Sequence, residues 1–191
     1  MNKVKVFEKE LKCINNKNIR EFTEKAISKL PDYFFVIPAS SSGKHHPAYA
    51  LEEGGLVKHT KATIGIATDL FRVSSFDNAF NSDEKDIIIT SLLLHDGLKS
   101  GKVKQKYTVA EHPLLVADML EEDNEINSCV DEEILSKITK NIRSHMGQWN
   151  KDYKTKKEIL PKPKGVMANF VHLCDYLASR KRIEVNFDVE Y

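Results

Sequence analysis

Six side chains in this sequence are of the types that bind metal ions, and they fall where a folded chain would bury them. Each lies on the apolar stripe or at the end of an expected helix: His59, His95, Asp96, His112, His145 and Asp175. Burying so many ionisable groups costs several kcal/mol each unless something compensates. A divalent cation does so, because neutral imidazole and carboxylate are natural ligands for it. The joint pattern therefore predicts a metal site.

Taken one at a time, these residues have simpler explanations. A lone histidine such as His59 or His112 is more often a capping or hydrogen-bonded residue than a ligand. An aspartate on an apolar helix edge, as Asp175 is, usually pairs with a basic residue or a backbone amide. The adjacent His95 and Asp96 are harder to explain in this way, because two polar groups together end a helix that is apolar all round.

The motifs around four of these residues resemble, in chain order, those of the HD-domain phosphohydrolases, a superfamily named for a His-Asp doublet. His59 stands in GGLVKHT, the doublet His95–Asp96 in LLLHDGLK and Asp175 in HLCDYLASR. The resemblance covers roughly residues 38–180. It implies an all-α helical bundle in which these four side chains bind one metal ion, and a metal-dependent phosphohydrolase or phosphodiesterase activity.

Two further histidines are similar to those of the family members that hold a second metal ion. His112 in EHPLLVADM and His145 in IRSHMG stand between the doublet and the distant aspartate. The resemblance implies that Asp96 bridges both ions and that a hydroxide between them is the nucleophile. Met146 is a departure, since some two-metal members have a second histidine there. Lys99 matches the lysine of the family's HDxGK motif, although the order here is HDGLK, and we assign it with Asp96 to catalysis; the alternative is a solvated lysine.

The segment before the metal-binding helix, IPASSSGKHHPAYALEEGGLVKHT, is similar to the corresponding stretch of bacterial HD-type 3'-5' exoribonucleases. We therefore expect Lys44, His45 and His46 to contact the substrate at the entrance of the site, together with Lys99 and Arg180. The alternatives are an ordinary exposed loop, or metal binding by His45 and His46.

The expected reaction is hydrolysis of a phosphate ester in a nucleotide or related phosphorylated molecule by a metal-activated hydroxide. Two alternatives stay open: a 3'-5' nuclease acting on RNA or DNA ends, and a non-catalytic, metal-stabilised domain that binds a nucleotide. One or two divalent ions are expected, with manganese, iron, nickel, cobalt, magnesium and zinc all open. Two basic loops suit a polyanion, and Trp149 and Tyr153 in the second could stack a base or pack on the domain.

Helical periodicity predicts the elements that position these residues. Helices are expected over about 18–30, 54–73, 82–96, 111–122, 131–146 and 165–181, with Ser82 capping the third. The stretch 31–56 is too rich in Pro, Ser and Gly for a regular element. The tail after Arg180 alternates apolar residues, so we expect it to add a short strand or to pack as an arm. We expect one domain over 1–191, with its core at about 38–180.

Composition and charge indicate which partners and which cellular location to expect for this domain. The 29 basic residues nearly balance the 28 acidic ones, so no global field attracts the chain to nucleic acid or membrane. The longest apolar run falls far short of the roughly 20 residues that span a bilayer. Three scattered cysteines indicate reduced thiols. A cytoplasmic protein without membrane association is expected.

Overall fold

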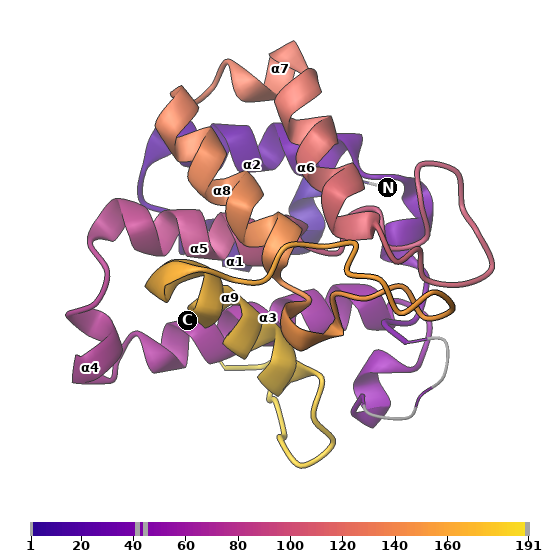
Figure 1. Cartoon of the computed structure of the whole chain (residues 1–191). Helices are drawn as coiled ribbons and strands as arrows, with labels where there is room; N and C mark the ends of the chain where they lie inside the picture. The colour runs from indigo at the N-terminus through magenta and orange to yellow at the C-terminus, as the bar shows by residue number, and fades with distance from the viewer. Residues whose placement is uncertain (1, 41–42, 44–45, 190–191) are drawn as a thin grey trace.

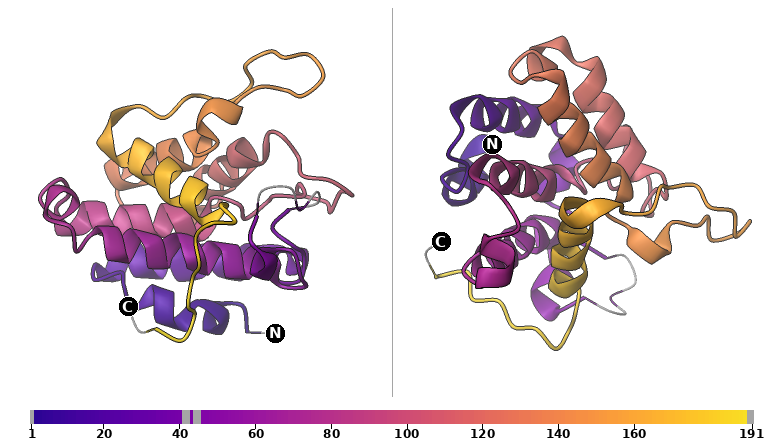
Figure 2. Two further views of the ribbon diagram at one scale, coloured as in Figure 1. Left: turned by 90° about the horizontal axis from the view of Figure 1, so that it is seen from below. Right: turned by 60° about the vertical axis from the view of Figure 1, so that its left-hand side comes forward.

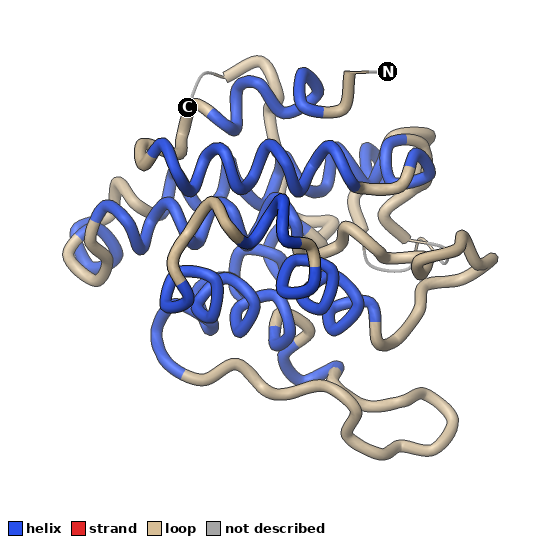
Figure 3. Tube along the Cα trace, turned by 90° about the horizontal axis from the view of Figure 1, so that it is seen from above, coloured by secondary structure: helices blue, strands red, loops and turns tan. Residues whose placement is uncertain are grey.

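The computed structural model describes residues 2–40, 43 and 46–189, and every regular element within that part of the chain is a helix. The α-helices run over α1 Glu8–Leu11, α2 Lys17–Lys29, α3 Gly55–Leu70, α4 Ser74–Asp77, α5 Ser82–Leu94, α6 His112–Glu122, α7 Asn124–Asn127, α8 Glu132–Ser144 and α9 Gly165–Ala178. Short 3-10 turns cover η1 Val4–Phe7, η2 Asp32–Phe35, η3 Ala48–Ala50 and η4 Gly147–Trp149. The expectation of an all-α bundle is confirmed (Figures 1 and 3).

Helix α5 is the centre of the bundle. It packs against α2, α3, α8 and α9, which surround it on all sides. Every residue from Ile87 to Leu94 is buried, as the absence of a polar face in the sequence predicted. The helix begins with a capping box in which Asn81 and Glu84 each satisfy a backbone amide of the other. Asn81, and not the predicted Ser82, is therefore the N-cap.

In the segment 31–56, predicted to be irregular, the described residues form the short turns η2 and η3 and the first residues of α3, and backbone hydrogen bonds fix the connections between them. The amide of Ala39 donates to the carbonyl of Ala50 over 2.8 Å, and the amide of Leu56 donates to the carbonyl of Ile37 over 3.0 Å. These bonds hold the described part of the segment against the start of α3, the helix that carries His59.

The C-terminal tail packs as an arm, and its described residues form no strand. It lies along α3, where Val185 and Phe187 line a cavity of about 360 Å³ with Ile66 and Leu70 of that helix. The ring of Phe187 meets Tyr49 edge-on, with centroids 5.1 Å apart. Of the two alternatives for the tail, the arm is therefore the one observed.

Three connections gather at one end of the bundle. Figures 1 and 2 show the described part of the stretch before α3, the loop between α5 and α6 and the loop between η4 and α9 on the same side. The last two are the basic loops of the sequence. In the described part of the chain, no helix combines the length and apolarity needed to cross a bilayer.

Candidate metal centre

The fold brings together all six side chains predicted as ligands, which lie in or directly after five different helices. His59 comes from α3, His112 is the first residue of α6, and Asp175 lies in the last turn of α9. His95 and His145 directly follow the ends of α5 and α8, and Asp96 follows His95. Five of the six side chains are almost completely buried, whereas Asp175 is 19% exposed. The cluster therefore meets solvent at Asp175.

The carboxylate of Asp96 lies between two pairs of imidazoles. Its Oδ1 is 2.9 Å from Nε2 of His112 and 3.8 Å from Nε2 of His145. Its Oδ2 is 3.5 Å from Nε2 of His95 and 3.9 Å from Nε2 of His59. Each oxygen of this one carboxylate thus faces a different pair of ring nitrogens.

Asp175 completes one side of the cluster. Its Oδ1 lies 3.0 Å from Nε2 of His59 and 3.6 Å from Nε2 of His95. Two overlapping groups, His59–His95–Asp175 and His95–Asp96–His145, each place their candidate ligand atoms within 4.8 Å of one another. Each group could hold a metal ion, and they share His95.

Backbone carbonyls fix the orientation of three of the imidazoles. In each ring, Nδ1 lies 2.7–2.8 Å from the carbonyl oxygen of the residue three positions earlier: His95 with Leu92, His112 with Val109 and His145 with Ile142. A carbonyl can only accept, so Nδ1 carries the proton and donates it. In the neutral ring the other nitrogen, Nε2, is then a free lone pair. This arrangement is typical of metal-binding histidines.

Several of these nitrogens are left without a hydrogen-bond partner. Among the described residues, Nε2 of His95, Nε2 of His112 and Nδ1 of His59 are buried and unsatisfied. Lone pairs that point at carboxylate oxygens repel unless a positive charge lies between them. A proton on a ring nitrogen can supply that charge, and so can a divalent cation, for which these nitrogens and oxygens are suitable ligands.

The carboxylates and imidazoles of the cluster shift one another's pKa values. Burial favours the neutral form of both carboxyls, but Lys99 and His95 outweigh it and hold the pKa of Asp96 well below its usual range. For Asp175, the hydrogen bond with His59 and the nearby His95 likewise overcome burial and lower the pKa. Burial and the neighbouring imidazoles lower the pKa of His145 to about 3. Burial acts in the same direction on His95, yet the two carboxylates raise its pKa to about 10.

The predicted catalytic lysine and one loop histidine lie beside the cluster. Nζ of Lys99 donates to Oδ2 of Asp96, and the ring of His46 meets that of His59 edge-on at 5.5 Å. Burial, followed by His59 and Lys99, lowers the pKa of His46 to about 4. Lys99 also opens into a cavity of about 220 Å³, lined by Ile37, Pro38, Ser100, Lys104, Gln105, Lys106, Tyr107 and Thr108.

The remaining predicted substrate residues are placed differently. The guanidinium of Arg180 lies over the ring of Tyr176, 4.3 Å from its centroid, and donates to the hydroxyl of Ser179 and the carbonyl of Tyr176. It therefore belongs to an aromatic group beside the cluster. Lys44 and His45 lie outside the described residues, so their predicted contacts with substrate stay predictions.

One supporting residue was not anticipated. Nδ1 of His172 lies 2.7 Å from the carbonyl oxygen of His145, and its Nε2 lies 3.0 Å from Oε1 of Gln148. His172 thus ties α9 to the end of α8, where a predicted ligand stands. The available signal was its position three residues before Asp175 in HLCD, which places both on one face of the helix.

No protein-family model, curated protein or solved structure matches this chain. What the cluster does must be inferred from its own ligand types and geometry. Buried imidazoles with fixed orientations and two ionised carboxylates suit a divalent ion, and the side chain of Asp175 is the part of the cluster that is open to solvent.

Proposed function

We propose that this chain binds one or two divalent metal ions at the cluster and uses them to hydrolyse a phosphate ester of a nucleotide or related molecule. The observation that carries the proposal is the convergence of four imidazole Nε2 atoms on the carboxylates of Asp96 and Asp175. The resemblance of the surrounding motifs to HD-domain phosphohydrolases supports the same assignment.

The residues of the chain have separate roles in this proposal. A bound divalent ion would lower the pKa of a coordinated water towards neutrality and so supply the nucleophile. The two oxygens of Asp96 face different pairs of imidazoles, which suits one carboxylate that serves two metal positions. Lys99 brings a positive charge to the same carboxylate, where it could neutralise a phosphoryl oxygen. His46 covers the cluster beside His59.

The surroundings of the cluster favour an anionic substrate. Both basic loops project at the end of the bundle where the segment before α3 also lies (Figure 2). Lys104 and Lys106 line the cavity into which Lys99 opens. Clustered positive charge beside a site attracts polyanions. The same feature supports the second candidate function, a nuclease acting on the end of an RNA or DNA strand.

Metal analysis joined to activity assays tests the proposal. The purified protein should contain a divalent metal and should hydrolyse aryl phosphate mono- or diesters once that metal is restored. His95→Ala and Asp96→Asn should lose both the metal and the activity, because each removes a ligand from the shared part of the cluster. Full metal content and turnover in either variant would overturn the assignment.

Asp86 offers a matched control on the same helix. Its buried carboxylate accepts hydrogen bonds from the amides of Asn15 and Asn16 at 3.0 and 2.7 Å, outside the cluster. Asp86→Asn should therefore keep the metal and the activity. A loaded wild-type protein that binds nucleotides without releasing product would be a binding domain and not an enzyme. Faster cleavage of oligonucleotides than of mononucleotides would favour the nuclease.

A further inference from the structure

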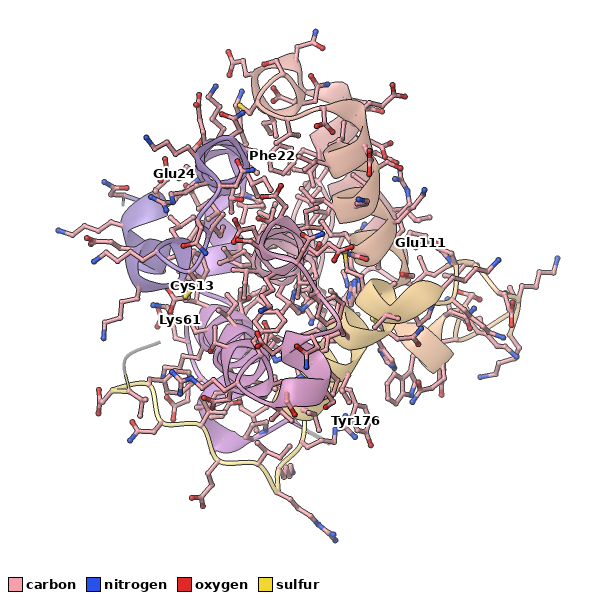
Figure 4. The ribbon with its side chains drawn as sticks, turned by 90° about the vertical axis from the view of Figure 1, so that its left-hand side faces the viewer. Cys13, Phe22, Glu24, Lys61, Glu111 and Tyr176 are labelled. Carbon is pink, nitrogen blue, oxygen red and sulfur yellow. The ribbon has the colours of Figure 1, made fainter. Side chains whose placement is uncertain are left out.

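Two stacked aromatic rings and a guanidinium lie next to the cluster of candidate metal ligands. The rings of Trp149 and Tyr176 are nearly parallel, at 13°, with centroids 5.8 Å apart. The guanidinium of Arg180 lies 4.3 Å from the centroid of Tyr176 and 6.0 Å from that of Trp149. Figure 4 places Tyr176 on α9, far from Phe22 and Glu24 of α2. Trp149 is the single tryptophan of the sequence and is 48% exposed.

Both rings are tied to residues of the cluster. Trp149 ends η4, four residues after His145, and Tyr176 directly follows Asp175, the one cluster residue with appreciable exposure. His172 lies against both rings and holds the carbonyl of His145 over 2.7 Å. The indole is therefore fixed at the edge of the site and does not sit on a free loop.

Packing alone does not account for an indole in this position. Tryptophan is highly buried on average, because its large apolar surface is costly to expose. Here about half of the side chain is open to solvent, although Tyr176 and His172 cover the other part. A flat, electron-rich surface with a nearby guanidinium suits a planar, polar ring, and such platforms stack nucleobases.

The charge around this platform, formed by Trp149, Tyr176 and Arg180, favours a base that carries phosphate. The loop that leads from η4 to α9 contains six lysines: Lys151, Lys154, Lys156, Lys157, Lys162 and Lys164. Together with Arg180 they favour an anionic ligand over a neutral aromatic one. A nucleotide meets both requirements, since its base would cover the indole while its phosphate reaches the exposed edge of the cluster at Asp175.

We propose that the exposed face of Trp149, backed by Tyr176 and Arg180, seats the nucleobase of the substrate and so makes this site selective for nucleotides over phosphate esters without a base. The inference rests on the proposed function for the placement of the phosphate. The seat itself is a property of the platform and can be measured without turnover.

The single tryptophan provides the first measurement. Adenosine 5'-monophosphate should quench the emission of Trp149 saturably, whereas ribose 5-phosphate, which has the same phosphate without the base, should leave it unchanged. A short oligoadenylate in the same titration separates a mononucleotide from a strand end as the source of the base. Emission that stays constant with both base-containing probes up to millimolar concentration would overturn the proposal.

Substitutions provide the second measurement. Stacking on one aromatic ring is worth roughly 5- to 150-fold in affinity, so Trp149→Ala should raise KM for the nucleotide by that factor and leave ribose 5-phosphate unaffected. The KM of Trp149→Phe for the nucleotide should fall between those of the wild type and Trp149→Ala, which excludes misfolding as the cause. Val73→Ala is the control, because Val73 is an apolar side chain outside the platform with the same exposure as Trp149, 48%, and its loss should have no effect.

Different results would reject the proposed hydrolysis and the proposed nucleobase seat. Saturable quenching by adenosine 5'-monophosphate without release of phosphate would support the base seat and reject hydrolysis of that ester. Turnover of nucleotide and ribose 5-phosphate with equal kcat/KM, unchanged in Trp149→Ala, would keep the hydrolase and reject the seat.

Discussion

Replacing Gly147 by alanine should loosen the contact between α9 and the end of α8 next to the cluster. Gly147 has φ of +57° and lies two residues after His145. A Cβ at this position would overlap the imidazole of His172. That ring must then move away from the carbonyl of His145 and the side chain of Gln148, which it contacts at 2.7 and 3.0 Å.

The size of the effect follows from these contacts. An alanine in the left-handed region costs about 1 kcal/mol relative to glycine. Each of the two hydrogen bonds of His172 contributes about 1 kcal/mol to stability. Gly147→Ala should therefore lower the free energy of unfolding by about 3 kcal/mol, measured by urea denaturation followed by circular dichroism.

Gly165 supplies a matched control for the backbone cost. It also has positive φ, +83°, but a Cβ there would meet nothing within 4 Å. Gly165→Ala should therefore cost only about 1 kcal/mol. In a protein that already carries His172→Ala, Gly147→Ala should lower the free energy of unfolding by only about 1 kcal/mol, as Gly165→Ala does. Equal losses for the two glycine substitutions in the otherwise wild-type chain would refute the role given to His172.

Three further predictions concern capping, charge and pH. Asn81→Ala removes the N-cap of α5 and should cost about 1 kcal/mol of stability in urea denaturation, with a smaller loss for Asn81→Ser. Lys99→Met should lower kcat by about 100-fold or more while the metal content stays constant, because the positive charge beside Asp96 is lost; an unchanged kcat would contradict this role. Burial raises the pKa of Asp86 above its ordinary 3.8, so the native state binds more protons than the unfolded state just above that pH. Wild-type stability relative to Asp86→Asn should therefore fall as pH rises from about 3.8, and a flat difference between pH 3 and pH 7 would exclude this explanation.

Periodicity predicted the main helices because each buries one clear apolar face, and α5 was predicted to be buried all round because it has no polar face. Helix ends were predicted less well, since they depend on which side chain reaches the free amides. Asn81 precedes Ser82, and both are suitable caps by type. The short α1 and η1 were not predicted, because four residues do not define a period.

The candidate ligands could be found from sequence because each stands at a helix end or on a buried stripe, where a polar group requires a hydrogen-bond partner or a bound ion. Their mutual distances could not be predicted, since they depend on how five helices pack. The link from His172 to His145 depends on the same packing, whereas the contact of Arg180 with Tyr176, four residues earlier, is local. No local pattern in the sequence connects His172 of α9 with the residue that follows α8.

The ends of helices explain how this chain fixes three imidazoles. The last carbonyls of a helix have no intrahelical partner, so a histidine placed just after the end can donate its Nδ1 proton to one of them. His95 and His145 do so at the ends of α5 and α8, and His112 uses the turn before α6 in the same way. Each bond fixes the ring and leaves Nε2 facing the carboxylates; the carbonyls of Val109 and Ile142 also accept from the amides of His112 and His145. The same contacts therefore serve both helix termination and the orientation of the candidate ligands, which is why the cluster is ordered by the bundle itself.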